Sequence, residues 1–218
     1  ASALAMPALD AEPGAPPNPR TLFAAAPVLP CHDLTEGELR RLFGAAWRHE
    51  ERDGHGLLSF FTGEQSHVVL RAKEARTMRP HGHLLRTNRA RVPEEAALTS
   101  TAWMAGTFHS MVTQGHVSIN RFLSTTHGYL SLFRSHGQRI FIETAAGWRR
   151  LDLPSAFDMR PDACRWLYRL PEALSEIRSA ALTTCHALTL DIVVHEGSPM
   201  RCLVTHHVAL NGDDGSES

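Results

Sequence analysis

The sequence predicts a mainly β protein, an antiparallel β-sandwich with one N-terminal amphipathic helix and an Ala/Pro-rich tail. From residue 97 onward, short apolar or alternating runs follow one another, separated by Gly, Pro, Asp or Asn. In contrast, apolar residues recur at helical spacing in one segment, near residues 35–52. Because no strand pattern alternates with a helix pattern, the strands are expected to pair antiparallel.

The first 30 residues are rich in Ala and Pro, with AEPGAPPNPR at their centre. Such a composition is extended and buries little apolar surface, so residues 1–30 are expected to form a flexible linker or tail. Residues 31–218 are expected to form one β-sandwich domain, because a chain of this length can bury a full core. The chain lacks a starting Met, which favours excision from a longer protein.

The helix is predicted over roughly residues 35–52. Thr35 and Glu38 have the spacing of a capping box, in which each side chain bonds a backbone amide of the first turn. Gly54 is a suitable stop signal at the other end. The apolar residues between these limits that recur at helical spacing are Leu39, Leu42, Phe43, Ala46 and Trp47.

The other elements are predicted as strands joined by turns. The last two strand-like runs resemble antiparallel strands connected by the turn EGSP, and Leu188, Leu190, Ile192 and Val194 point to one side of the first. All apolar or alternating runs taken together cover residues 57–61, 67–72, 81–87, 100–115, 117–124, 138–144, 147–153, 164–170, 173–182, 186–194 and 200–210.

Charge and composition argue against several classes of protein. The formal net charge is -1, so a broad electrostatic contact with nucleic acid is not expected. No apolar stretch reaches the length of a membrane span, and the first residues lack the basic and apolar regions of a secretory signal. The four cysteines are scattered without a CxxC pair, which indicates reduced thiols. We therefore expect a cytoplasmic protein that binds neither nucleic acid nor a membrane.

The 14 histidines raise the question of a metal site. His81 and His83 would share one side of a strand, whereas His206 and His207 would lie on opposite sides. A carboxylate follows the first pair only at Glu94, after a proline, and no closely spaced Cys/His set suits zinc. Neither a metal nor another cofactor is expected.

Residues for nucleophilic or acid–base catalysis are also hard to nominate. The sequence lacks GxSxG, SxxK, GxxxxGK and GxGxxG patterns. Asp152, Asp158 and Asp162 lie close together, but they are interpreted as turn residues around Pro154 and Pro161. No catalytic residue is therefore assigned.

Aromatic residues and arginines are interleaved from residue 103 to residue 169. Such a mixture can bind a sugar by stacking and hydrogen bonding, or can form the centre of an interface with another domain. The alternative is that the aromatics form the core and the arginines cover the sheet edges. The predicted carbohydrate or interdomain contact residues are Asn120, Arg121, Tyr129, Phe133, Arg134 and Arg139, with Phe122 between them.

Four segments carry a resemblance to a known family: LTSTAWMAGTFHSMVTQGHVSINRFLS, SHGQRIFIE, LDLPSAFDMRPDACRWLY and CLVTHHVAL. Their succession resembles the N-terminal β-sandwich region of cellobiose-phosphorylase-like inverting glycoside phosphorylases, closest to the 1,2-β-oligoglucan phosphorylase branch. The resemblance covers roughly residues 97–210. It rests on the order and residue pattern of these segments and not on a short diagnostic motif.

The resemblance implies a non-catalytic accessory domain of a large enzyme that acts on β-glucan oligosaccharides. In that family an (α/α)6 barrel carries the general acid and the phosphate pocket, so the implied partner is such a barrel of the same parent chain. An oligosaccharide is a further implied ligand, and a homodimer is left open. Two alternatives remain: a free-standing carbohydrate-binding module, and a small metal-dependent enzyme that uses the histidines.

Overall fold

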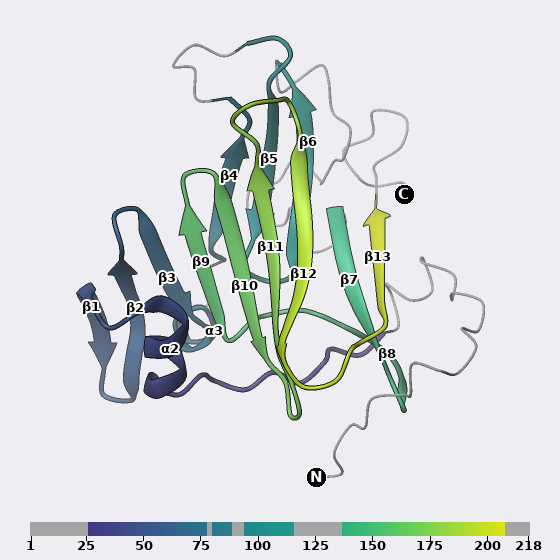
Figure 1. The fold of residues 1–218 in the computed structure, drawn as a ribbon. Helices are drawn as coiled ribbons and strands as arrows, with labels where there is room; N and C mark the ends of the chain where they lie inside the picture. The colour runs from purple at the N-terminus through teal and green to yellow at the C-terminus, as the bar shows by residue number, and fades with distance from the viewer. Residues whose placement is uncertain (1–25, 78–79, 89–93, 116–136, 208–218) are drawn as a thin grey trace.

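The computed structural model describes residues 26–77, 80–88, 94–115 and 137–207, and within them the chain forms antiparallel sheets in two layers (Figure 1). The first layer is a seven-stranded sheet in the order β1-β2-β3-β9-β10-β11-β12. Its strands are β1 (Trp47–Asp53), β2 (Gly56–Thr62), β3 (Ser66–Leu70), β9 (Ala156–Arg160), β10 (Ala163–Arg169), β11 (Leu174–Ala181) and β12 (Leu188–Glu196). The predicted antiparallel, mainly β class is confirmed.

Two three-stranded sheets form the second layer. One has the order β4-β5-β6, from β4 (Gly82–Arg86), β5 (Leu98–Trp103) and β6 (Thr107–Gln114). The other has the order β13-β7-β8, from β13 (Cys202–His207), β7 (Gly137–Thr144) and β8 (Gly147–Arg150). β6 contacts β7, and β4 contacts β10 and β11 of the first layer. The second layer therefore covers one face of the seven-stranded sheet.

The main core lies between the layers. Trp166 of β10 is fully buried there, with its ring centroid 4.9 Å from that of Phe108 and 5.1 Å from that of Phe157. Its indole Nε1 donates a hydrogen bond to the Trp103 carbonyl at 3.0 Å, so the ring joins β10 to β5 through both apolar and polar contacts. Several aromatics of the predicted sandwich core are thus confirmed as core residues.

Helix α2 (Glu36–Phe43) begins with the predicted capping box. The Glu38 amide donates to Thr35 Oγ1 at 3.2 Å, and the Thr35 amide donates to Glu38 Oε2 at 2.8 Å. The predicted extension to residue 52 is wrong, because Gly44 at φ 77° ends the helix and β1 begins at Trp47. Trp47 stacks on Phe60 of β2 at 4.3 Å, so a strand contact explains its apolar character.

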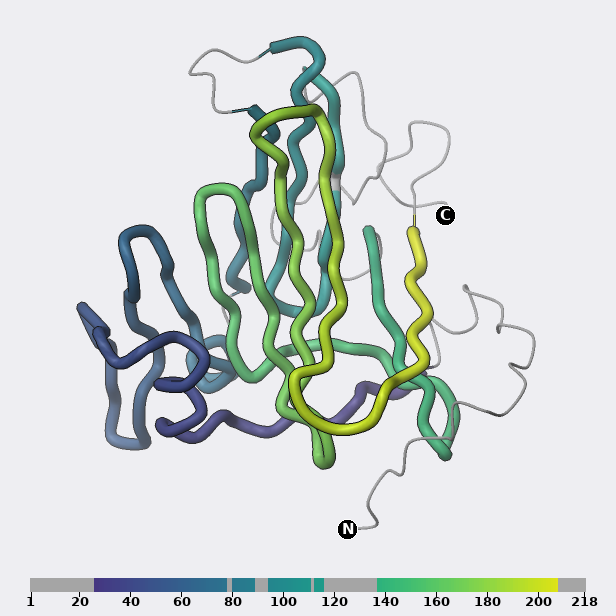
Figure 2. The backbone as a smooth tube through the Cα atoms, in the orientation of Figure 1, coloured from purple at the N-terminus to yellow at the C-terminus, as the bar shows by residue number. Residues whose placement is uncertain are grey.

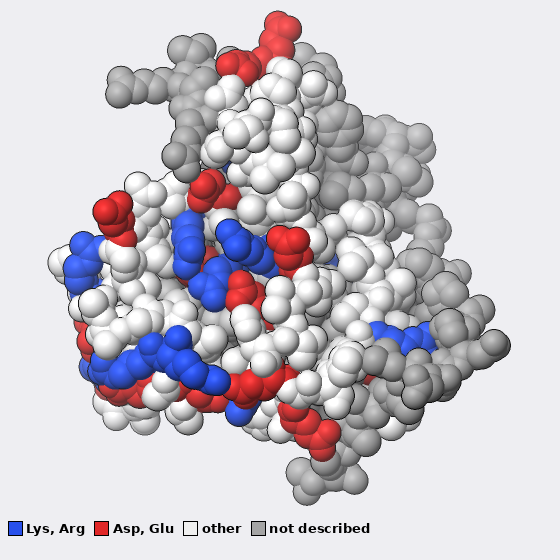
Figure 3. Space-filling view, in the orientation of Figure 1, with Lys and Arg blue, Asp and Glu red and all other residues white. Residues whose placement is uncertain are grey.

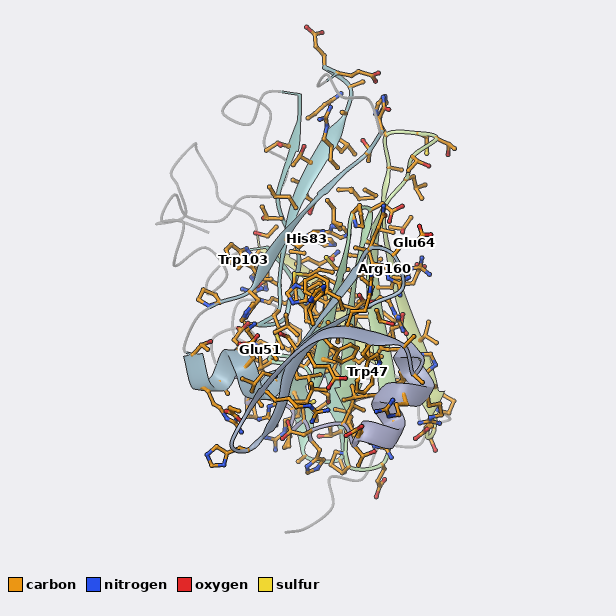
Figure 4. All side chains as sticks on the ribbon, turned by 90° about the vertical axis from the view of Figure 1, so that its left-hand side faces the viewer. Trp47, Glu51, Glu64, His83, Trp103 and Arg160 are labelled. Atoms are coloured by element: carbon orange, nitrogen blue, oxygen red, sulfur yellow. The ribbon has the colours of Figure 1, made fainter. Side chains whose placement is uncertain are left out.

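A second helix, α3 (Arg71–Thr77), was not predicted. The run at residues 67–72 is strand only to Leu70, where α3 follows directly. Figure 4 shows α2 and α3 on opposite sides of the sheet, with Trp47 toward α2 and Glu51 toward α3. Lys73 of α3 forms an ion pair with Glu51 of β1, which attaches the helix to the edge of the sheet.

The predicted pairing of the last two strands is wrong. β12 pairs with β11 at the edge of the seven-stranded sheet, whereas β13 pairs with β7 in the second layer. The yellow tube in Figure 2 shows the intervening chain crossing from one layer to the other. Gly197 at φ 97° begins this crossing, in a backbone conformation that favours glycine. Of the four residues predicted to share one side of β12, Leu188, Leu190 and Ile192 pack on the core, whereas Val194 is exposed.

Residues 27–29 also belong to the packed structure. Leu29 is buried, and its amide donates to the Arg150 carbonyl at 2.8 Å. The Arg150 amide in turn donates to the Pro27 carbonyl at 2.9 Å. Residues 1–25 and the predicted strand at 117–124 lie outside the described part of the chain. Within that part, neither helix has the length and apolar character needed to cross a membrane.

Candidate functional site

Five of the six predicted contact residues lie outside the described residues: Asn120, Arg121, Tyr129, Phe133 and Arg134. Their role as a carbohydrate or interdomain surface stays a prediction, as does that of Phe122. The sixth is Arg139, which is described.

Arg139 lies on β7 with 2% of its surface exposed. Its guanidinium donates to the Gly106 carbonyl at 3.3 Å and to the Thr107 hydroxyl, which ties β7 to the turn before β6. Burial, and then the nearby charge of Arg150, lower the pKa of Arg139 to about 9. These contacts give Arg139 a structural role within this chain, and its contact with a sugar or another domain remains a prediction.

Three of the four histidines considered for a metal contact other protein groups. His81 Nδ1 lies 3.1 Å from Glu74 Oε2, and His83 Nε2 lies 2.6 Å from the Arg160 carbonyl. His207 Nε2 lies 2.9 Å from the Thr205 hydroxyl. Among the described residues, no three His, Cys, Asp or Glu side chains come together in a group that could hold a metal ion.

The interpretation of Asp158 as a turn residue is wrong. Asp158 lies within β9 and its side chain is fully buried. It accepts a hydrogen bond from the Ser66 hydroxyl of β3 and from Arg160 Nε at 3.1 Å. Arg165, its directly paired neighbour on β10, donates to the same carboxylate at 3.3 Å. These hydrogen bonds give the buried carboxylate the polar partners that burial would otherwise remove.

Arg165 joins Asp158 to a second carboxylate, that of Glu176 on β11. Its Nε and second terminal nitrogen donate to the two Glu176 oxygens at 2.8 and 2.9 Å, a bidentate pair. His195 of β12 completes the cluster, with Nε2 2.9 Å from Glu176 Oε2. Figure 3 shows acidic and basic side chains gathered on this face of the seven-stranded sheet, the face that carries α2. We call Asp158, Arg165, Glu176 and His195 the charged cluster.

Because of the charged cluster, the free energy of unfolding should depend on pH in the acid range. Burial by itself raises the pKa of Glu176, but hydrogen bonds and charge from Arg165, and then from His195, bring it below its ordinary value of 4.5. The ionised form is thus favoured by folding, so this stabilisation is complete above pH 4.5 and is lost as the pH falls through the lower folded-state pKa.

We therefore expect the urea midpoint of the protein to fall as the pH drops below 4.5, and to fall less in a Glu176→Gln variant. Other carboxylates with lowered pKa values, such as Glu51 and Glu196, remain in both proteins and cancel in the comparison. Parallel curves of midpoint against pH for the two proteins would contradict the assignment to Glu176.

A pocket of about 370 Å³ lies beside the charged cluster. Three turns of the chain form it: the end of α2, the turn between β2 and β3, and the turn between β9 and β10. Its lining includes an apolar part with Phe43 and Pro161, and a polar part with Glu64, Gln65, Arg160 and Asp162. Figure 4 shows Glu64 and Arg160 on the same side of the sheet as α2.

Neither the charged cluster nor the pocket is predicted by a pattern in the sequence. In the sequence, Arg165 is one of several arginines interleaved with aromatic residues, and Glu64 and Gln65 lie between two predicted strands without a pattern of their own. One usable signal is the run AFDMR, in which Asp158 stands between the apolar residues Phe157 and Met159 of a strand-like segment.

Comparison with known proteins places the chain in a family. Residues 46–217 match the family model described as the glycoside phosphorylase supersandwich domain. The chain is also similar to a 1,2-beta-oligoglucan phosphorylase of Listeria innocua serovar 6a, with 28% identity over 165 residues, covering 76% of this chain. The chain spans 15% of the length of that relative. The resemblance seen in the sequence is confirmed, and the chain belongs to the family of glycoside phosphorylase supersandwich domains.

Proposed function

We propose that this chain is a non-catalytic accessory domain of a large glycoside phosphorylase that acts on β-glucan oligosaccharides. Two observations together carry the proposal. Residues 46–217 match the supersandwich domain of glycoside phosphorylases, and the chain spans only 15% of the length of the phosphorylase relative. The other 85% of that relative's length has no counterpart in this chain, and it is long enough to contain a separate catalytic domain. The domain would then supply a rigid sandwich beside the catalytic part of the same parent chain.

The charged cluster supports a structural role for its carboxylates. A glycosidic general acid needs a raised pKa so that it carries a proton near neutral pH. The pKa of Glu176 is instead lowered, because the effects of Arg165 and His195 outweigh burial, and Asp158 accepts hydrogen bonds from two arginines. These carboxylates are suited to holding β9, β10 and β11 together.

We further propose that the N-terminal segment links this domain to the rest of the parent chain. The Ala/Pro-rich composition predicts a linker over residues 1–30, whereas Pro27 and Leu29 form backbone hydrogen bonds with Arg150 of β8. The proposed linker then ends before Pro27. On this proposal, the predicted contact residues between Asn120 and Arg134 are candidates to meet the catalytic barrel.

A phosphorolysis assay tests the function. The protein encoded by the complete reading frame, given a 1,2-β-linked glucan oligosaccharide and inorganic phosphate, should release sugar 1-phosphate. The 218-residue chain alone should release none under the same conditions. Turnover by this chain alone would contradict the accessory role. A reading frame limited to these 218 residues, or a longer parent without phosphorolytic activity, would contradict the assignment to a larger phosphorylase.

A further inference from the structure

The pocket beside the charged cluster has the size and lining of a small-ligand site. Its volume of about 370 Å³ is within the range of pockets that hold small molecules. Leu42 and Pro161 offer apolar surface, while Glu64 and Gln65 offer hydrogen-bonding groups around it. A pyranose ring presents the matching combination of apolar C–H faces and a rim of hydroxyl groups.

The walls of the pocket are held in place by contacts behind them. The Thr62 hydroxyl donates to the Phe43 carbonyl at 2.8 Å, which ties the end of α2 to β2. The Phe43 ring is in edge contact with Phe60 at 5.7 Å and lies below the Arg165 guanidinium at 5.4 Å. On the other side, Arg160 is oriented by Asp158 through contacts at 3.1 and 3.0 Å. A site fixed in this way loses little conformational entropy when a ligand binds.

The polar groups at the rim are available to a ligand. Glu64 and Gln65 are exposed, and the structure gives neither side chain a partner among the described residues. The turn that carries them is fixed by Gly63, which has φ 57° and whose carbonyl accepts a hydrogen bond from Arg48. Arg160 lines the pocket with 39% of its side chain exposed, so part of its guanidinium remains accessible.

The charge of the pocket favours a neutral ligand over an anion. The carboxylates at or behind the pocket are those of Glu64, Asp162 and Asp158. Three guanidinium groups, those of Arg160, Arg48 and Arg165, lie at the same site, so the pocket has no excess of positive charge. Without an excess of positive charge, the pocket offers inorganic phosphate or a sugar phosphate little electrostatic attraction. A neutral sugar can instead donate hydroxyl protons to the Glu64 carboxylate and the Gln65 amide oxygen.

We infer that this pocket binds one or two glucosyl units of a β-glucan oligosaccharide, apart from any catalytic site of the parent enzyme. The choice of a glucan rests on the proposed function, whereas the neutral, hydroxyl-rich class of ligand rests on the pocket itself. Such a site would hold a distant part of a long substrate, or keep the enzyme on a polymer, at a modest affinity with a dissociation constant on the order of 1 mM.

Titration of the 15N-labelled chain with a 1,2-β-linked glucotriose tests the inference by NMR. Saturable amide shifts should occur in the turns at residues 62–66 and 160–162 and at the end of α2. A Glu64→Ala/Gln65→Ala double variant should bind about tenfold more weakly, because two hydrogen bonds are lost. Glu172→Ala, an exposed change in the turn between β10 and β11, serves as the matched control and should bind like the unmodified chain.

Inorganic phosphate and glucose 1-phosphate form the second arm of the titration. Shifts of the pocket amides by inorganic phosphate alone would overturn the neutral-sugar assignment, as would the absence of saturable shifts with the glucotriose. Equal binding by the double variant would also overturn it. If the parent enzyme is phosphorolytic but the chain does not bind the glucotriose, only the pocket inference fails. If the chain binds but the parent lacks phosphorolytic activity, only the proposed function fails.

Discussion

Replacement of Arg165 with Met should lower the free energy of unfolding by about 3–5 kcal/mol. The side chain of Asp158 is fully buried and that of Glu176 is 9% exposed, and Arg165 donates hydrogen bonds to both. Removal of the guanidinium leaves two carboxylates close together without the cation between them. Their desolvation is then compensated poorly, and they repel each other. Urea denaturation monitored by tryptophan fluorescence measures the loss.

Arg178→Met is the matched control for this change. Arg178 lies directly across from Arg165 on β11, but its side chain is exposed. The same substitution there should change the free energy of unfolding by no more than about 0.5 kcal/mol. Equal losses at the two positions would show that Arg165 contributes through general charge and not through the buried pair. The loss at Arg165 should also shrink at low pH, where Glu176 becomes protonated.

Local patterns in the sequence were enough to predict the β class, the capping box and most of the strands. Thr35 and Glu38 form their hydrogen bonds within one turn of helix, so their spacing alone predicts the contact. The spacing of apolar residues predicts a helix that is too long, because Trp47 continues the apolar spacing of α2. In the structure Trp47 belongs to β1 and packs on Phe60 of β2. At this point a tertiary contact overrides the local periodicity.

The charged cluster depends on strand pairing that the sequence does not reveal. Asp158 and Arg165 meet because β9 and β10 pair in a register that places them opposite each other, and Glu176 joins them from β11. The partition of β12 and β13 between two sheets is likewise decided by the packing of the layers. The pocket is even harder to predict from the sequence. It forms only where three segments that are separate in the sequence come together, which brings Glu64 and Arg160 into the same lining.

Replacement of Trp166 with Ala should also lower the free energy of unfolding by about 3–5 kcal/mol. The ring is fully buried between Phe108 of the second layer and Phe157 of the neighbouring strand. Its loss leaves a cavity between the two sheets, and the Trp103 carbonyl loses the indole donor at 3.0 Å. A domain whose stability exceeds about 5 kcal/mol would keep its fold but unfold at a much lower urea concentration.

Two further variants separate cavity formation from the loss of the hydrogen bond. Trp166→Phe keeps most of the ring volume but removes the donor to Trp103, so its urea midpoint should lie between those of the unmodified protein and Trp166→Ala. Trp148→Ala removes a half-buried tryptophan from β8 and should cost at most about 1 kcal/mol. If Trp148→Ala cost as much as Trp166→Ala, the contact between the layers at Trp166 would not be the main source of stability. The core would then have to extend well beyond the space between the two layers.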